Sequence, residues 1–251
     1  MTDEQELNQK RAHAHMYIRV TKGGPYLVYG NLSLDQELII PNENGTPWIY
    51  RKGTLKFSNE EPMVLCRCGA SGNKPFCDGS HVHHEWNQAE TATHKNVQDG
   101  ADVIEGKRLK LVDNGMLCSF ARFCEVKDGI CNMVQNANTE EDLELIKRVV
   151  AHCPSGSLML WDKITNTPLE PEFQPSLSIV EDCGMKVSGP LRVKGRIKLI
   201  SSENKPYEIR NRMTLCRCGK SGNKPFCDGS HVDARFNDGL SLVAKKPIED
   251  E

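Results

Sequence analysis

The sequence contains the stretch CRCGASGNKPFCDGSHV at residues 66–82, which returns at residues 216–232 as CRCGKSGNKPFCDGSHV. The two copies differ only where Ala70 is replaced by Lys220. Each copy places three cysteines and one histidine within sixteen residues. Thiolates and imidazoles are metal ligands, so each copy carries a complete four-ligand set. The repeat therefore predicts two metal centres in one chain.

The spacing C-x-C-x2-S-x3-P-x-C-D-G-S-H resembles the signature of the CDGSH iron-sulfur family, to which mitoNEET belongs. Both copies match it without a gap. The resemblance implies a 2Fe-2S cluster in each copy, with two ligands on each iron. In the first copy it pairs Cys66 with Cys68 and Cys77 with His81. In the second copy the same roles fall to Cys216, Cys218, Cys227 and His231.

The residues around these ligands are consistent with a cluster. An imidazole in place of a thiolate removes negative charge from the site and raises its potential. Gly69, Gly72 and Gly79 allow the backbone to approach inorganic sulfide closely. Asp78 and Asp228, each followed by Gly and Ser, are typical of helix N-caps, which would direct backbone N–H groups at an anionic cluster.

The same cysteines and histidines could instead form a zinc site or disulfide bonds. A tetrahedral Cys3His zinc site takes the same ligand types, but structural zinc sites favour C-x2-4-C pairs, whereas here the first pair is C-x-C. A disulfide framework is disfavoured because cysteines one residue apart cannot reach good bridge geometry without strain.

Length and composition set further limits. A chain of 251 residues has room for two or three small domains. It has eleven cysteines, and Met1–Lys10 is polar and acidic, without the apolar run of a secretory signal. These features favour a reducing compartment in which thiols bind metals. Because no apolar run approaches the roughly 20 residues that span a bilayer, we expect a soluble cytoplasmic protein, unlike the membrane-anchored members of the family.

Other classes of partner find little support. A formal net charge of -2 argues against nucleic acid, which requires a basic excess or a basic stripe. The chain has no G-x-G-x-x-G and no G-x-x-x-x-G-K-[ST], so a bound dinucleotide or nucleotide is not predicted.

The repeat extends upstream of the ligands. The stretch GPYLVYG at residues 24–30 aligns with GPLRVKG at residues 189–195, and each is followed by an alternating apolar pattern typical of a strand. The ligand motifs lie 150 residues apart and these upstream stretches 165, so the first copy carries about fifteen more residues between strand and ligands. Residues 39–50 fit there as a hairpin with an Asn-Gly turn.

The segment between the repeats has cysteines of its own. Cys118 and Cys124 form C-x5-C, and Cys153 is followed by Pro154. This pattern resembles the C-x2-C-x2-C and distant C-P ligands of bacterial ferredoxins with the middle cysteine replaced by Ala121. Three thiolates in this order resemble the single-cluster 3Fe-4S ferredoxins, whose corner iron has no protein ligand. A capping box over residues 139–142 and an apolar stripe to Val150 predict a helix that leads into Cys153.

Two alternatives stay open for this segment. It is a ferredoxin fold without a cluster if the cysteines are simply small buried side chains. It holds a 4Fe-4S cluster if Cys131 supplies a fourth thiolate. Cys183 lies outside any ligand spacing and is expected to be a free buried thiol. No metal-binding spacing is found for His13, His15, His83, His84, His94 or His152.

The sequence therefore predicts an α+β chain of three modules. Residues 1–96 form an N-terminal CDGSH domain, residues 97–174 a ferredoxin-like domain with a 3Fe-4S cluster, and residues 175–251 a C-terminal CDGSH domain. We expect a non-enzymatic protein that transfers single electrons between protein partners. We expect it in the cytoplasm, and we expect it to bind neither nucleic acid nor membranes. The alternatives are storage, delivery or repair of 2Fe-2S clusters, and redox sensing. An enzyme whose open corner iron binds substrate is disfavoured because no acid-base pair is recognised.

The repeat also makes a prediction about assembly. The two CDGSH modules are expected to pack together within one monomer around a pseudo-two-fold axis, with their matched strands at 24–30 and 189–195 pairing or exchanging. Tethering two similar modules in one chain raises their effective concentration and favours this intramolecular arrangement.

Overall fold

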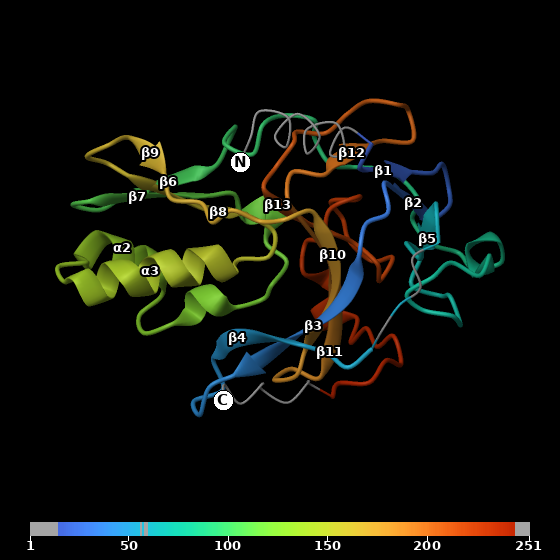
Figure 1. Ribbon diagram of the computed structural model, residues 1–251, viewed down its shortest axis with the longest axis horizontal. Helices are drawn as coiled ribbons and strands as arrows, with labels where there is room; N and C mark the ends of the chain where they lie inside the picture. Colours follow the sequence, from blue (N-terminus) through green and yellow to red (C-terminus); the bar gives the residue numbers. More distant parts are fainter. Residues whose placement is uncertain (1–14, 56, 58–59, 244–251) are drawn as a thin grey trace, which may run out of the picture.

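A computed structural model describes residues 15–55, 57 and 60–243. The polar segment Met1–Lys10 and His13 lie outside the described residues. The described part is α+β, with thirteen strands in three sheets and a few short helices, as the sequence predicted (Figure 1). Among the described helices, none has the length and apolarity required to cross a membrane.

The first sheet has the order β12-β1-β2-β5. Three of its strands come from the N-terminal part of the chain: β1 (Tyr17–Val20), β2 (Tyr26–Tyr29) and β5 (Met63–Leu65). Alternate side chains of β1 and β2 are buried, which is the period of two that places one face of a strand on a core. The fourth strand, β12 (Lys198–Ile200), comes from the C-terminal part and pairs in parallel with β1.

The second sheet has the order β13-β11-β10-β3-β4. The C-terminal part supplies β10 (Ser176–Asp182), β11 (Val187–Lys194) and β13 (Arg212–Leu215). The N-terminal part supplies β3 (Leu34–Pro41), which pairs in parallel with β10, and β4 (Pro47–Lys52). β3 and β4 form the predicted hairpin, and Gly45 in its turn has a φ of 80°.

The two outer parts of the chain thus exchange strands. β3 leaves the N-terminal part to join the C-terminal sheet, and β12 makes the reverse crossing. The prediction that the Gly-Pro strands themselves pair or exchange is wrong: β2 pairs only with β1 and β5, and β11 only with β10 and β13. The strand that follows each of them in the sequence crosses instead. β3 pairs in parallel with the open edge of β10, and β12 pairs in parallel with the open edge of β1.

The exchange produces one shared hydrophobic core. Ile18, Tyr26 and Leu65 from the N-terminal part pack in the same cluster as Leu191 and Met213 from the C-terminal part. Burial of this shared apolar surface is the main force that holds the two parts together. The oligomeric state of the chain stays a prediction.

The third sheet lies in the central segment and has the order β6-β7-β8-β9. Its strands are β6 (Asp102–Glu105), β7 (Leu109–Asp113), β8 (Leu158–Asp162) and β9 (Thr167–Pro168). Two helices, α2 (Ile130–Asn136) and α3 (Glu140–His152), pack beside this sheet (Figure 1). The capping box of Thr139 and Asp142 is confirmed, and α3 buries the predicted stripe of Leu143, Ile146, Val149 and Val150.

The remaining short helices all lie near cysteine-rich loops. They are η1 (Ser80–Val82), η2 (Gly115–Leu117), η3 (Phe123–Glu125) and α4 (Ser230–Asp233). In Figure 1 the second sheet lies between the central sheet and the first sheet. This order places the C-terminal part of the chain in the middle of the molecule.

Candidate metal centres

The first copy of the motif forms a loop after β5. The backbone N–H of Cys66 donates to Pro75 O at 2.8 Å, and that of Cys77 donates to Val64 O at 2.9 Å, so the loop closes on its own strand. The ligands fall into two close pairs. Cys66 Sγ and Cys68 Sγ lie 3.8 Å apart, and Cys77 Sγ lies 3.3 Å from His81 Nδ1.

The second copy repeats this geometry after β13. Cys216 Sγ and Cys218 Sγ lie 3.7 Å apart, and Cys227 Sγ lies 3.4 Å from His231 Nδ1. Among the described residues, no group of three or more His, Cys, Asp or Glu side chains is positioned to hold one metal ion. Each set therefore consists of a dithiolate pair and a thiolate-imidazole pair.

The loops fit an anionic cluster in their backbone as well as in their donors. The N–H of Ala70 donates to Cys68 Sγ at 3.4 Å, and the N–H of Lys220 approaches Cys218 Sγ at 3.5 Å. Hydrogen bonds to the sulfurs are among the features that tune cluster potentials. Sulfur ligands with backbone donors beside them form a donor set suited to iron and sulfide.

The prediction that Asp78 and Asp228 are helix N-caps needs correction. The N-cap residues are Gly79 and Gly229, both with left-handed backbones. Asp78 instead accepts hydrogen bonds from the N–H of Ser80 at 3.0 Å and of Gly72 at 2.7 Å, tying the two ends of the ligand loop together. These bonds, with one from the Ser80 hydroxyl, hold the pKa of the Asp78 carboxyl well below its usual value.

The two ligand loops meet back to back. A Cβ atom placed on Gly219 would lie 2.2 Å from Cys68 O, and one on Gly69 would lie 2.4 Å from Cys218 O. Both glycines have positive φ, 82° at Gly69 and 77° at Gly219. Only glycine permits this approach, so the contact between the two centres depends on these two positions.

An arginine between the first two ligands ties each loop to its own sheet. Arg67 Nε donates to Gly24 O and Arg217 Nε donates to Gly189 O, both at 2.8 Å. Each guanidinium also lies over an aromatic ring, Arg67 over Trp86 at 4.6 Å and Arg217 over Phe236 at 5.4 Å. The role of these arginines was not predicted, although both copies place Arg within C-x-C and repeat the Gly-Pro stretch that it contacts.

The two centres differ in exposure despite their near-identical sequences. Cys77 and His81 are half-buried, whereas Cys227 and His231 are 2% and 4% exposed. The central segment covers the second centre: Asn223 Nδ2 donates to Met116 O at 2.7 Å, and a Cβ on Gly229 would lie 3.0 Å from Phe120 Cβ. Burial, together with the charge of Arg217, lowers the pKa of His231 to about 4.

The three predicted ligands of the central segment border a common cavity. Cys118, Cys124 and Cys153 line one cavity of about 210 Å³, and Ala121 lines it with them. Burial raises the pKa of the Cys124 thiol to about 12. Burial also acts to raise the pKa of Cys153, but the charge of Arg212 and a contact with Ser157 at 3.3 Å outweigh it, and the pKa falls.

The other cysteines and histidines lie elsewhere. Cys131 lies in α2 and is not among the residues that line the central cavity. Cys183 is half-buried after β10, outside all three sets. His94 stacks on Tyr207 with ring centroids 4.2 Å apart, and His152 Nδ1 lies 2.7 Å from Arg148 O. All eleven cysteines are free thiols.

A buried carboxyl beside the second centre predicts a pH dependence of stability. Glu181 pairs with Arg217 at 2.7 Å, and Arg217 also pairs with Asp238. Burial, with a further contribution from Asp238, raises the pKa of Glu181 from 4.5 to about 7. The folded protein therefore binds a proton that the unfolded chain releases, so this stability is complete below pH 4.5 and is lost as pH rises through about 7.

We expect E181Q to flatten the pH dependence of the free energy of unfolding between about pH 5 and 7, where one such group contributes a slope of at most about 1.4 kcal/mol per pH unit. Anaerobic denaturant unfolding at several pH values measures it, with the exposed Glu172 as a control in E172Q. An unchanged slope in E181Q would contradict the raised pKa.

Comparison with known families agrees with this arrangement. A family described as iron-binding zinc finger CDGSH type matches residues 23–82 and 188–232. A family described as divergent 4Fe-4S mono-cluster matches residues 104–163. Searches of curated proteins and of solved structures found no match.

The chain is therefore an iron-sulfur cluster protein. Two CDGSH regions flank a divergent 4Fe-4S mono-cluster region, and this order of the three regions, predicted from the sequence, is confirmed. The type of cluster in the central region stays a prediction.

Proposed function

We propose that this protein transfers single electrons between protein partners through two 2Fe-2S clusters and one 3Fe-4S cluster. The observation that carries the proposal is the contact between the loops that carry the three predicted ligand sets. The loop with Cys118 covers the loop with Cys227, and the loop with Cys218 contacts the loop with Cys68. The half-buried His81 lies at one end of this series. Iron-sulfur clusters, when bound, accept and return single electrons.

Three arginines fix the loops that carry the predicted ligands. Arg67 and Arg217 fix the two outer loops to their sheets. Arg212 Nε donates to Cys153 O at 2.7 Å and its Nη2 donates to Val150 O at 3.0 Å, which holds the end of α3 in place. Three thiolates around a cavity with Ala121, and Cys131 outside it, support a three-thiolate set in the centre.

The proposal includes a cytoplasmic monomer with redox proteins as partners. The proposed use of nine of the eleven cysteines as cluster ligands, with no disulfide among them, supports a reducing compartment. Strand exchange within one chain supports the monomer. The exchanged strands β3 and β12 already fill the sheet edges that two separate subunits would otherwise use to pair with each other. Sedimentation at micromolar concentration should give a mass near 28.1 kDa.

Rapid anaerobic mixing tests electron transfer. The oxidised protein should be reduced by a ferredoxin and its reductase, and reoxidised by an added electron acceptor, with all iron retained over many cycles. Loss of iron during cycling, or failure of any cluster to be reduced by the protein donor, would contradict the proposal.

A second function, delivery of 2Fe-2S clusters, is favoured by the different exposure of the two outer centres. Solvent and acceptor ligands reach Cys77 and His81 more easily than Cys227 and His231. If the protein delivers clusters, the N-terminal centre is the donor. Formation of a cluster on an apo-ferredoxin acceptor would support this function.

We therefore expect an iron chelator to remove the N-terminal cluster well before the C-terminal one, by roughly tenfold in rate or more. The single variants H81C and H231C distinguish the two centres. In each variant the new thiolate ligand should retain iron better than the imidazole and should change the spectrum of the substituted cluster alone. Visible circular dichroism during chelation follows both. Equal rates at the two centres would show that exposure does not control release.

A further inference from the structure

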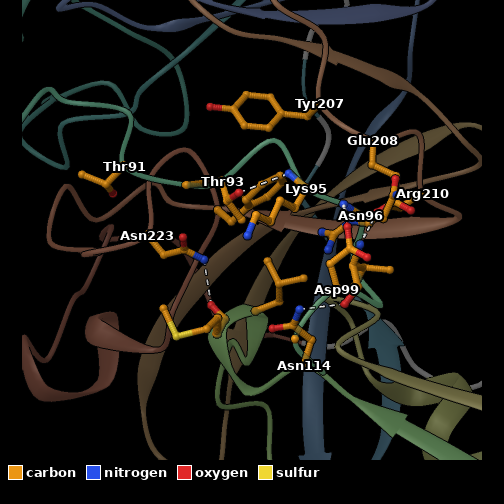
Figure 2. A pocket seen from close by; sticks show the side chains of 16 residues that line it. Thr91, Thr93, Lys95, Asn96, Asp99, Asn114, Tyr207, Glu208, Arg210 and Asn223 are labelled. Atoms are coloured by element: carbon orange, nitrogen blue, oxygen red, sulfur yellow. Dashed lines mark hydrogen bonds between the residues drawn. The ribbon is translucent and has the colours of Figure 1, made fainter. Parts of the chain in front are cut away.

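A cavity of about 230 Å³ lies where the central segment meets the C-terminal part of the chain (Figure 2). One wall is the connecting segment 91–100, and a second comes from the loop ahead of Cys118. The C-terminal part supplies the third wall, with Tyr207, Arg210 and Phe226. None of the three cluster ligand sets lines it.

Arg210 is the unusual residue in this cavity. Its guanidinium carbon lies 4.8 Å from the centroid of the Phe226 ring. Two of its three nitrogens, Nε and Nη2, are closed off from solvent and have no hydrogen-bond partner among the described residues. These two nitrogens form one edge of the guanidinium, the fork that pairs with a carboxylate through two parallel hydrogen bonds.

Two enclosed guanidinium nitrogens without hydrogen-bond partners are unfavourable. Burial lowers the pKa of Arg210 to about 10, and the nearby Glu208 offsets this only in part. Replacement of one such charge by a packed apolar side chain often stabilises a protein. A residue that costs stability and lines a cavity is therefore better explained by a ligand than by folding.

The two acidic side chains of the cavity are already engaged. Glu208 accepts the N–H of Val97 at 2.7 Å, and Asp99 accepts the N–H of Asn96 at 3.1 Å. These bonds shape the connecting segment around the cavity. The exposed Lys95 lines the cavity and adds a second positive charge to it (Figure 2).

We propose that this cavity binds a small organic anion, a monocarboxylate with an apolar body. The guanidinium of Arg210 rotates to open its Nε–Nη2 edge to the cavity, and the carboxylate pairs with this edge and with Lys95. The apolar body packs on Phe226, Leu117 and Tyr207. A volume below that of drug-sized pockets limits the ligand to a small molecule.

The position of the cavity links the ligand to two metal centres. Phe226 directly precedes the ligand Cys227, and Leu117 directly precedes the ligand Cys118. A bound anion adds negative charge beside both sets. This consequence rests on the proposed clusters, whereas binding itself does not.

Benzoate is the probe, with benzyl alcohol as its uncharged analogue. Calorimetric titration of the purified holoprotein should detect benzoate and give at least tenfold weaker binding of benzyl alcohol. R210M should weaken benzoate binding roughly tenfold to a hundredfold, because it removes a charge-assisted pair. R51M, at an exposed arginine of β4, should bind like the parent. Equal binding of both probes, or unchanged binding in R210M, would overturn the proposal.

Stability separates a ligand role from a structural one. Without benzoate, R210M should unfold at the same temperature as the parent or a higher one, and benzoate should stabilise only the parent. A clear loss of stability in R210M without benzoate would show that Arg210 serves the fold, and would overturn the proposal. K95M, at an exposed position, provides a second variant that is expected to fold and to bind benzoate more weakly. Parent-like binding in K95M would exclude Lys95 from the site.

Discussion

Replacing Cys153 by alanine is expected to lower the iron content from about seven to about four irons per chain. Cys153 ends α3, is 9% exposed and lines the central cavity with Cys118 and Cys124. Removal of one of three thiolates leaves two, which cannot retain a 3Fe-4S cluster. The oxidised 3Fe-4S cluster is paramagnetic and oxidised 2Fe-2S clusters are not, so the EPR signal of the oxidised protein should disappear.

Iron and sulfide analysis of anaerobically purified protein, together with EPR, measures this result. C131A is the matched control, because Cys131 lies in α2 of the same domain and outside the cavity. It should retain about seven irons and the full signal. About eight irons in the parent, reduced in C131A, would instead establish a 4Fe-4S cluster with Cys131 as a ligand. About four irons in the parent would show that the central domain holds no cluster.

Replacing Gly219 by alanine is expected to destabilise the whole outer assembly by roughly 3 kcal/mol or more. The new Cβ would lie 2.2 Å from Cys68 O, and the φ of 77° at this position is strained for any residue with a side chain. The methyl group would push the two ligand loops apart. Because the loops meet here, iron should be lost from both outer centres and not only from the substituted one.

Two controls separate the causes. G222A adds a Cβ that meets only Asp228 Oδ2, at 3.5 Å, and should be tolerated. G45A has the same backbone strain, with a φ of 80°, but no atom within 4 Å of its Cβ, so it should show the cost of strain alone. Denaturant unfolding and iron content measure all three variants. If G219A loses no more stability than G45A, the close contact between the loops is not essential.

The ligand sets were predictable because their information is local. In each outer loop the four donors lie within sixteen residues, so a short closed loop brings them together whatever surrounds it. The stripe from Leu143 to Val150 likewise specifies a helix through its period alone, and the structure buries all four apolar positions. Cys118, Cys124 and Cys153 were recognised by their resemblance to ferredoxins, and their convergence depends on the folding of α3.

Strand exchange could not be predicted from the sequence. The apolar residues of β3 and β12 indicate strands, but they do not specify which edge each strand joins. That choice depends on which partner edge is open after β1 and β10 have paired with their neighbours. The role of Asp78 was misjudged for a similar reason, since an aspartate before Gly and Ser can cap a helix or close a loop.

The sequence by itself determined the class of protein and predicted the donors and their three sets, because these follow from residue types at characteristic spacings. Only the tertiary structure decided how the sets differ. Two motifs that share all but one residue have histidines of different exposure, because the central domain packs on one of them alone. The unpaired edge of Arg210 also depends on residues from distant parts of the chain. Burial is a property of what surrounds a side chain, and residues far apart in the sequence supply those surroundings.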